Sequence, residues 1–250
     1  MDDLRQRPRP EAIDLRIVYE DEWLLAVDKP AGMVVHPTYR NTSGTLLNGV
    51  LWRVRDRPGA SPGILTRLDK DTSGLVILGL TAAIHAAMQK DGGAGRITKQ
   101  YLAVVRGTPA PPAGRISLPL GRDSADRRLV VVRPDGQSAE TRYEVISSSP
   151  RGEPSGSPTD PSGPPADSPV ISLLRCEPIT GRTHQIRVHL AASGWPIVGD
   201  RVYGVTDPVI TRQALHAWKV ALPHPVTRQP LDIEAPLPDD LAPLLQNFTL

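Results

Sequence analysis

The sequence is poor in cysteine, in aromatic residues and in net charge. Cys176 is its only cysteine, so the chain cannot build a disulfide framework or a thiolate-rich zinc site. Aromatic residues make up 4% of the 250 residues and only one is phenylalanine, so the core must be aliphatic. The formal net charge of +2 does not identify a partner, because nucleic-acid binding depends on locally clustered Lys and Arg.

Long apolar runs are missing as well. No stretch approaches the length needed to span a membrane, and the charged N-terminus lacks the apolar centre of a secretory signal. Together with the single cysteine, these absences predict a soluble cytoplasmic protein. The length suits one substantial domain, and the hydrophobic content of 39% is sufficient for a core.

Short apolar segments separated by turn residues predict an α+β protein with a mixed, mostly antiparallel sheet and flanking helices. The expected strands lie at 16–20, 23–28, 75–80, 99–107, 115–120, 128–133, 138–147, 170–176, 215–221 and 231–235. Helices are expected at 43–54, 81–90, within 181–194 and at 238–247. Thr81 is the expected N-cap of the second helix, and Asp91-Gly92-Gly93 is its expected end.

Two segments do not fit the expected core. Residues 1–14 are polar and charged, which predicts a flexible N-terminal arm. In residues 147–169, seventeen of the 23 residues are Ser, Pro or Gly, and only Ala166 is aliphatic. Such a segment buries too little surface to offset its ordering entropy, so we expect a disordered loop inserted between two strands of one sheet.

Two common kinds of catalytic site are poorly supported. The motif Gly-Ala-Ser-Pro-Gly at 59–63 matches the nucleophile elbow of serine hydrolases, but no buried strand is expected before it and no helix after it. A plain loop is therefore favoured. The six histidines show no metal-binding spacing, although a metal site assembled from distant residues stays open. A glycine-rich phosphate-binding loop is also missing from the sequence.

A polar turn next to an apolar run is a stronger candidate. Arg67, Asp69, Lys70 and Asp71 stand directly before the apolar run 75–80. Asp71 is followed by Thr, Ser and Gly, which is typical of a turn whose short side chains bond the local backbone. Asp69 has no such explanation, so it is a candidate lone nucleophile.

A second polar cluster lies on the third expected helix. Arg182, His184, Gln185, Arg187 and His189 fall within eight residues, and His184 and Arg187 are one helical turn apart. These side chains could bind a phosphate or pair with a carboxylate, or they could form a solvated helix face. The interleaved apolar residues indicate partial burial, and a buried arginine requires a partner.

Five blocks of the sequence resemble, in their order, the RluA-type pseudouridine synthases, which isomerise uridine in ribosomal and transfer RNA. The blocks are VDKPAGMVVHP (27–37), RLDKDTSG (67–74), KQYLAVVRG (99–107), GRTHQIRVHLAASGWPIVGD (181–200) and LHAWKVALPHP (215–225). The resemblance extends from about Leu15 to near Phe248 and implies one catalytic domain over residues 15–250. Many members begin with a separate RNA-binding domain, which is not expected here because only 14 residues precede that range.

The resemblance also implies roles for five residues. Asp69 matches the family's catalytic aspartate, and Tyr101 matches the tyrosine that stacks near the target base. Arg187 matches the basic partner of the aspartate, which would keep that carboxylate ionised. Arg67 matches an arginine implicated in opening the RNA around the flipped base, and Arg182 is a second basic candidate near the site.

The implied reaction needs neither a cofactor nor a metal, because the uracil is detached, rotated and rejoined through C5 with nothing added or removed. The target uridine must leave its stack, and Asp69 would act as the nucleophile. Attack at the ribose C1′ and proton removal at C2′ both stay open. Thr66 departs from the family, which usually has histidine before Arg-Leu-Asp, and this bears on target handling more than on catalysis.

The implied partner is RNA. The arginines that could follow its phosphates are Arg122, Arg127, Arg128 and Arg133. Nearby aspartates dilute this cluster, so an exposed hairpin of mixed charge is the alternative. For the whole chain, the alternative to an enzyme is a non-catalytic RNA-binding module or RNA chaperone. No membrane contact is expected, and a monomer is predicted.

Overall fold

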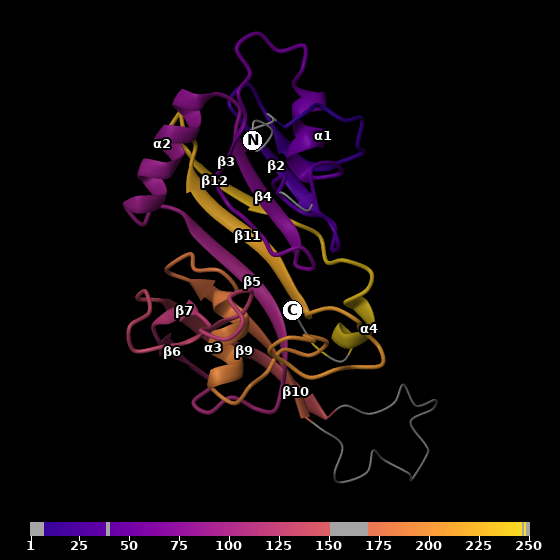
Figure 1. Ribbon diagram of the computed structural model, residues 1–250, viewed down its shortest axis with the longest axis vertical. Helices are drawn as coiled ribbons and strands as arrows, with labels where there is room; N and C mark the ends of the chain where they lie inside the picture. The colour runs from indigo at the N-terminus through magenta and orange to yellow at the C-terminus, as the bar shows by residue number, and fades with distance from the viewer. Residues whose placement is uncertain (1–7, 39–40, 151–169, 247, 249–250) are drawn as a thin grey trace. The chain divides into compact units, whose positions relative to one another are not determined.

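In the computed structural model, the chain passes three times between two units of structure (Figure 1). Residues 8–38, 41–150, 170–246 and 248 are described. Unit 1 combines Met1–Lys99 with His216–Pro238, and unit 2 combines Gln100–Leu215 with Asp239–Leu250. The structure defines each unit by itself.

Unit 1 is a sheet with a helix packed on each face. Its strands are β1 (Arg16–Glu20), β2 (Leu24–Lys29), β3 (Gly63–Ile64), β4 (Ser73–Gly79), most of β11 (Leu215–Pro223) and β12 (Pro230–Glu234). Its helices are α1 (Leu46–Arg53) and α2 (Ala82–Gly93). The strand order is β1-β2-β4-β11-β12, with β3 also paired to β4, and only the pairing of β4 with β11 is parallel.

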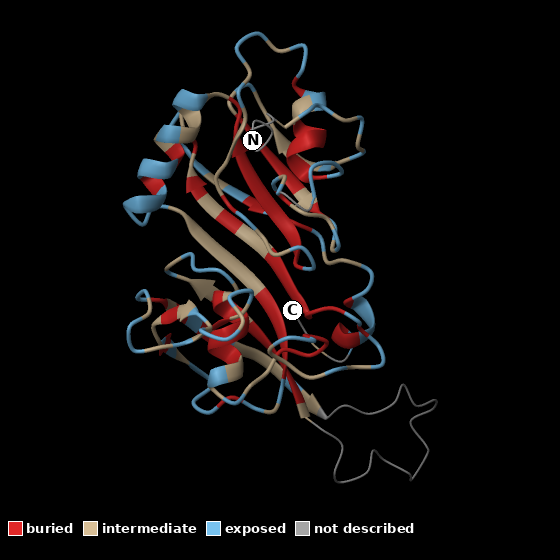
Figure 2. Cartoon of the chain, in the orientation of Figure 1, coloured by how far each residue is buried: buried red, intermediate tan, exposed pale blue. Residues whose placement is uncertain are grey.

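The apolar run that follows the polar turn forms β4, which is buried along its whole length (Figure 2). Its side chains alternate between the two faces of the sheet. Leu75 and Ile77 pack with Met88 of α2, whereas Val76 and Leu78 pack in a second cluster with residues of α1. Burial on both faces explains why this strand lacks the polar alternation of a half-exposed strand.

Helix α2 is longer than the sequence predicts. Thr81 is the N-cap, as expected, and its hydroxyl accepts from the backbone N–H of Ile84 at 3.3 Å. The predicted end at Asp91-Gly92-Gly93 is wrong, because these residues still belong to the helix. The Asp91 carboxylate accepts hydrogen bonds from Arg96 and Arg228, so it does not need the backbone of a turn.

The described part of the expected N-terminal arm lies against α1. Asn48 donates from its side chain to the carbonyl of Arg9 at 2.7 Å, and the backbone N–H of Glu11 donates to the carbonyl of Asn48 at 3.0 Å. Gly49 gives room for this contact, because a Cβ there would lie 3.0 Å from Leu15. Residues 1–7 lie outside the described part of the chain.

Unit 2 contains an antiparallel sheet in the order β5-β10-β9-β6 and a separate hairpin of β7 and β8. The strands are most of β5 (Thr98–Arg106), β6 (Ala113–Ser117), β7 (Leu120–Arg122), β8 (Val130–Val132), β9 (Glu140–Pro150) and β10 (Val170–Pro178). The helices are α3 (Gln185–Ala192) and α4 (Ala242–Leu245). The α+β class with a mixed, mostly antiparallel sheet is confirmed.

The predicted loop starts too early. Residues 147–150 belong to β9, where they pair antiparallel with the first residues of β10 up to the pair Pro150 and Val170. The serines extend the strand because the backbone supplies the pairing, and the Ser148 and Ser172 hydroxyls bond each other at 2.8 Å. Residues 151–169 lie outside the described part of the chain. The flanking strands β9 and β10 are neighbours in one sheet, as expected.

Two further predictions are settled by the described residues. The 59–63 motif leads into β3 and not into a helix, which confirms that it is no nucleophile elbow. The expected closing helix is reduced to the four residues of α4. Among the described residues, no helix is long and apolar enough to cross a membrane.

Candidate active site

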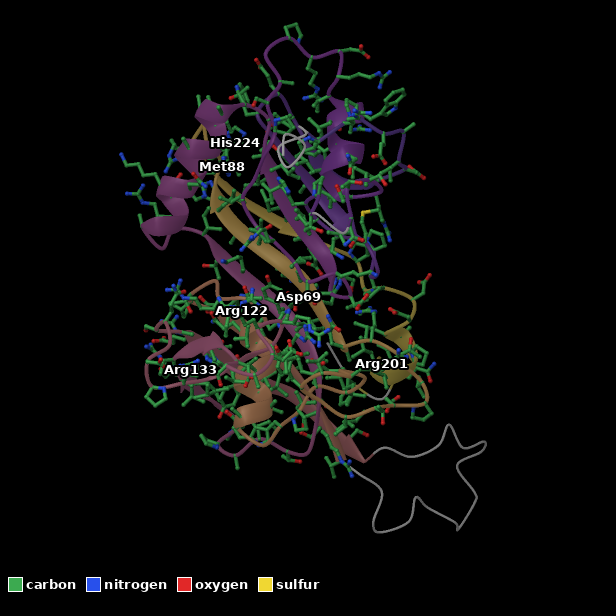
Figure 3. The ribbon with its side chains drawn as sticks, viewed as in Figure 1. Asp69, Met88, Arg122, Arg133, Arg201 and His224 are labelled. Carbon is green, nitrogen blue, oxygen red and sulfur yellow. The ribbon has the colours of Figure 1, made fainter. Side chains whose placement is uncertain are left out.

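Asp69 lies in the turn that precedes β4 in unit 1 (Figure 3). The turn is closed by a hydrogen bond from the backbone N–H of Thr72 to the Asp69 carbonyl at 3.1 Å. Asp69 is half-buried, whereas Arg67 is exposed. Arg67 and Asp69 therefore lie close together in sequence, just before the start of the buried strand β4.

Lys29 fixes this turn from inside the protein. Its side chain is 0% exposed, and its ammonium donates to the carbonyls of Pro30, Met33 and Lys70 at 2.8, 3.0 and 2.9 Å. A buried ammonium is stable only when its N–H groups are satisfied, and here backbone carbonyls satisfy them. Because Lys70 is next to Asp69, the bond from Lys29 to the Lys70 carbonyl holds the backbone beside the candidate nucleophile.

Close approach of two strands completes the turn. Gly74 has a φ of +107°, and a Cβ there would lie 2.2 Å from the carbonyl oxygen of Ala217. Only glycine allows this contact, which belongs to the parallel pairing of β4 with β11. The Ser73 hydroxyl lies 3.0 Å from Nδ1 of His216, so this side chain also contacts a histidine that is distant in sequence.

Thr66 has a structural role at the position where the resembling family usually carries histidine. Its side chain is buried, and its hydroxyl accepts from the backbone N–H of Ile77 at 2.9 Å. Ile77 lies in β4, so the hydroxyl ties the segment before the turn to the strand after it.

In unit 2, Arg187 forms a buried ion pair with Asp200. The guanidinium donates from Nε and Nη2 to the two carboxylate oxygens at 2.7 and 2.9 Å, and the side chains are 6% and 0% exposed. Burial alone would raise the pKa of Asp200, but Arg187 and two backbone N–H groups outweigh it and lower the pKa. The prediction that a buried arginine here requires a partner is confirmed.

Tyr203 connects Arg187 with His184. The centroid of its ring lies 5.0 Å from Cζ of Arg187. Its hydroxyl accepts from the backbone N–H of Val130 at 2.9 Å and lies 2.8 Å from Nδ1 of His184. His184 precedes α3 with a φ of 55°, a left-handed conformation that is uncommon outside glycine. The predicted proximity of His184 and Arg187 therefore takes the form of a shared contact with Tyr203.

The other two predicted site residues also belong to unit 2. Tyr101 is half-buried in β5, opposite Cys176 of β10. Burial raises the pKa of the Cys176 thiol to about 12, so this cysteine is not a nucleophile at neutral pH. Arg182 is exposed before α3, and its Nε donates to the carbonyl of Ser138 at 3.1 Å.

The predicted arginine cluster lies on and around the β7–β8 hairpin, where Figure 3 labels Arg122 and Arg133. Arg128 pairs with Asp126 at 2.6 Å, and Arg133 pairs with Asp135 at 2.6 Å. The structure thus supports an exposed hairpin of mixed charge, in which aspartates neutralise part of the cluster.

The predicted residues are divided between the two units. Arg67 and Asp69 belong to unit 1, whereas Tyr101, Arg182 and Arg187 belong to unit 2. The pairing of Arg187 with Asp69 therefore stays a prediction.

Sequence reasoning missed three residues that hold the predicted ones. Lys29 and Asp200 lie within the quoted blocks and Tyr203 lies three residues after one of them, and this proximity was the available signal. In the described part of the chain, no three His, Cys, Asp or Glu side chains come together as metal ligands.

Unit 1 thus holds a half-buried acid in a turn that Lys29 fixes, and unit 2 holds a buried arginine that is paired with Asp200. Comparison with known proteins identifies the class. A model of the RNA pseudouridylate synthase family matches residues 23–192, and the chain belongs to this family. It is thus an RNA pseudouridine synthase, an isomerase that acts on RNA.

Individual relatives agree with this assignment. The chain is 37% identical to the uncharacterized RNA pseudouridine synthase YlyB of Bacillus subtilis, over 96% of this chain and 77% of the relative. It is 39% identical to ribosomal large subunit pseudouridine synthase D of Nitrosomonas europaea, over 96% and 67%. Among solved structures, human RNA pseudouridylate synthase domain containing 1 aligns with a TM-score of 0.68 and 26% identity, over 91% of this chain and 85% of that one.

Proposed function

We propose that this enzyme isomerises specific uridines in ribosomal or transfer RNA, as a cytoplasmic monomer, with residues 15–250 acting as one catalytic domain. Ribosomal RNA is the first substrate to test, because several similar proteins carry the name ribosomal large subunit pseudouridine synthase D. The family model that matches residues 23–192 carries the proposal, because that range contains all five predicted site residues.

In the proposed mechanism, Asp69 is the nucleophile and Arg187 is its basic partner. The target uridine leaves its stack and packs against Tyr101, a contact worth on the order of 1–3 kcal/mol. Arg67 helps to open the RNA around the flipped base, and Arg182 is a further contact near the site. The pinned turn around Asp69 supports this assignment, because a nucleophile must be held in position to react.

The reaction exchanges one bond to the ribose for another. The bond from N1 of uracil to C1′ breaks, the base rotates, and a bond from C5 to C1′ forms. The C5 hydrogen leaves as a proton and N1 gains one, so the product is an isomer of the substrate. Asp69 acts either by attack at C1′ or by removing the C2′ proton to give a glycal.

RNA binding outside the reacting base is assigned to the β7–β8 hairpin. Arg122 donates to a backbone carbonyl, that of Arg128, and Arg127 is exposed. Phosphate contacts from such arginines position RNA without reading its sequence. Asp126 and Asp135 reduce the positive charge, so the hairpin supplies a modest share of the affinity.

The test is tritium release from unmodified RNA labelled at uridine C5, since forming the new carbon–carbon bond expels that hydrogen. Wild type is expected to release tritium, and Asp69→Asn to lose release by about a thousandfold or more. Asp71→Asn is the matched control in the same turn, and its release should stay within about twofold of wild type.

Two outcomes would contradict the proposal. Wild type that binds ribosomal or transfer RNA without releasing tritium would favour the non-catalytic binding module. Undiminished release by Asp69→Asn would remove the aspartate from the nucleophile's role.

A further inference from the structure

The carboxylate that holds Arg187 is itself fixed in place. Oδ1 of Asp200 accepts from the backbone N–H groups of Val202 and Tyr203 at 2.9 and 3.1 Å. These bonds set the carboxylate in a turn that runs from residue 200 to 203. A guanidinium that binds both oxygens of such a carboxylate has its plane and direction defined.

Tyr203 restrains the same guanidinium on its face. One end of the tyrosine is held by its backbone bond to Asp200, and the other by the hydroxyl's contacts with Val130 and His184. The ring therefore cannot rotate freely while Arg187 lies over it. Arg187 meets a carboxylate along one edge and an aromatic ring on one face.

Stability alone is a weak reason for this arrangement. A buried ion pair costs so much desolvation energy that an apolar replacement of similar volume is often equally stable. Orientation is the better explanation, because side chains held by a surrounding shell of hydrogen bonds keep a reacting group within a fraction of an ångström of its productive position.

We propose that Asp200 and Tyr203 are positioning residues that orient the Arg187 guanidinium for the isomerisation. The inference rests on the proposed role of Arg187 as the partner of Asp69. Asp200 occupies the edge formed by Nε and Nη2.

The experiment compares single-turnover tritium release with RNA binding for three variants. Asp200→Asn keeps the shape of the side chain but replaces one acceptor oxygen with a donor, and we expect a reaction slower by about 10- to 100-fold, because a small misplacement of a reacting group can cost about a hundredfold. Tyr203→Phe keeps the ring and loses both hydroxyl contacts, so a smaller loss of about 3- to 10-fold is expected. The dissociation constant for RNA should stay within about threefold in both.

Arg187→Gln removes the positive charge while its amide can still donate to Asp200, so this variant separates the inference from the proposed function. If this variant reacts at the wild-type rate, the role of Arg187 in the reaction fails. If it is slow while Asp200→Asn and Tyr203→Phe react at the wild-type rate, the role of Arg187 stands and the positioning role is overturned. Val202→Ala is the matched control, because its exposed side chain lies in the same turn and only its backbone bonds Asp200.

A purely structural role would give a different pattern. It would lower the melting temperature, while the folded fraction would still react at the wild-type rate well below that temperature. Rate loss that only follows weaker RNA binding would also overturn the inference. If Asp200→Asn does not fold, Tyr203→Phe decides the question by the same two measurements.

Discussion

Single buried polar residues hold both halves of the proposed catalytic machinery. Lys29 binds the turn of Asp69, and Asp200 binds Arg187. The sequence could predict that a buried arginine requires a partner, but it could not predict which acid. Asp200 lies 13 residues from Arg187, beyond the end of α3, and only the fold brings the two together.

Lys29→Met should destabilise the protein and slow the reaction. The thioether fills much of the same volume but cannot donate, so three backbone carbonyls lose their hydrogen bond to the ammonium. We expect the free energy of unfolding to fall by about 2–4 kcal/mol in urea denaturation. The tritium-release rate of the folded variant should also fall, because the backbone beside Asp69 is no longer held.

Lys70→Met is the matched control, since that lysine lies in the same turn with its side chain exposed. It should change the free energy of unfolding by less than about 0.5 kcal/mol. A Lys29→Met protein as stable as this control would refute the proposed role of the buried ammonium.

Secondary-structure elements were predictable where local signals decide them. Thr81 caps α2, and the apolar run after the polar turn forms β4, because both depend on neighbouring residues. The end of α2 was not predictable from local signals, and the Asp91 carboxylate there binds Arg228, which is 137 residues away. The prediction that the serines at the end of β9 lie in a loop was also wrong. Their pairing with β10, which is distant in sequence, outweighs their weak preference for strand.

Helix α3 should make the protein sensitive to mild acid through His189. This side chain is 0% exposed, its Nε2–H donates to the carbonyl of Leu118 at 3.0 Å, and Nδ1 lies 2.9 Å from the Thr141 hydroxyl. Burial lowers the pKa of His189 below its ordinary 6.5, although the Leu118 carbonyl partly opposes this. The unfolded chain therefore binds a proton at higher pH than the folded one.

Neutral His189 contributes fully to the free energy of unfolding above about pH 6.5, the ordinary pKa of histidine. This contribution is lost as the pH falls from that value toward the lowered pKa of the folded protein. Between about pH 6.5 and 5.5 the free energy of unfolding should fall by up to about 1 kcal/mol. Urea denaturation of His189→Gln should show a shallower loss over this range than wild type. An unchanged slope would exclude His189 as the source, and exposed His36→Gln serves as the control.

At the scale of the whole molecule, residues far apart in sequence pack in the same hydrophobic cluster. In unit 1, Val220, Leu222 and Ile233 pack with Leu24 and Ile77, so strands from near the C-terminus complete a sheet begun near the N-terminus. Such non-local packing leaves little trace in a sequence. The arrangement of strands therefore could not be derived from local patterns, whereas the resemblance of five blocks could indicate the family.

The long connection between β9 and β10 should be dispensable for folding. Because these strands pair up to Pro150 and Val170, two residues suffice to join them, and Asn-Gly is the favoured choice for such a hairpin. Replacing residues 151–169 with Asn-Gly shortens the loop from 19 to 2 residues, which lowers the entropy cost of closing it by up to about 2 kcal/mol. Urea denaturation should show equal or greater stability.

Activity then reports whether the replaced segment contributes to catalysis on RNA. The proposed site residues all lie outside residues 151–169, so we expect the shortened enzyme to release tritium at the wild-type rate. A variant that keeps the length but scrambles the order of these residues is the matched control. If the shortened protein folds but reacts slowly while the scrambled one does not, loop length matters. If both react slowly, the order of residues matters, and the segment must then take part in binding RNA or in the reaction.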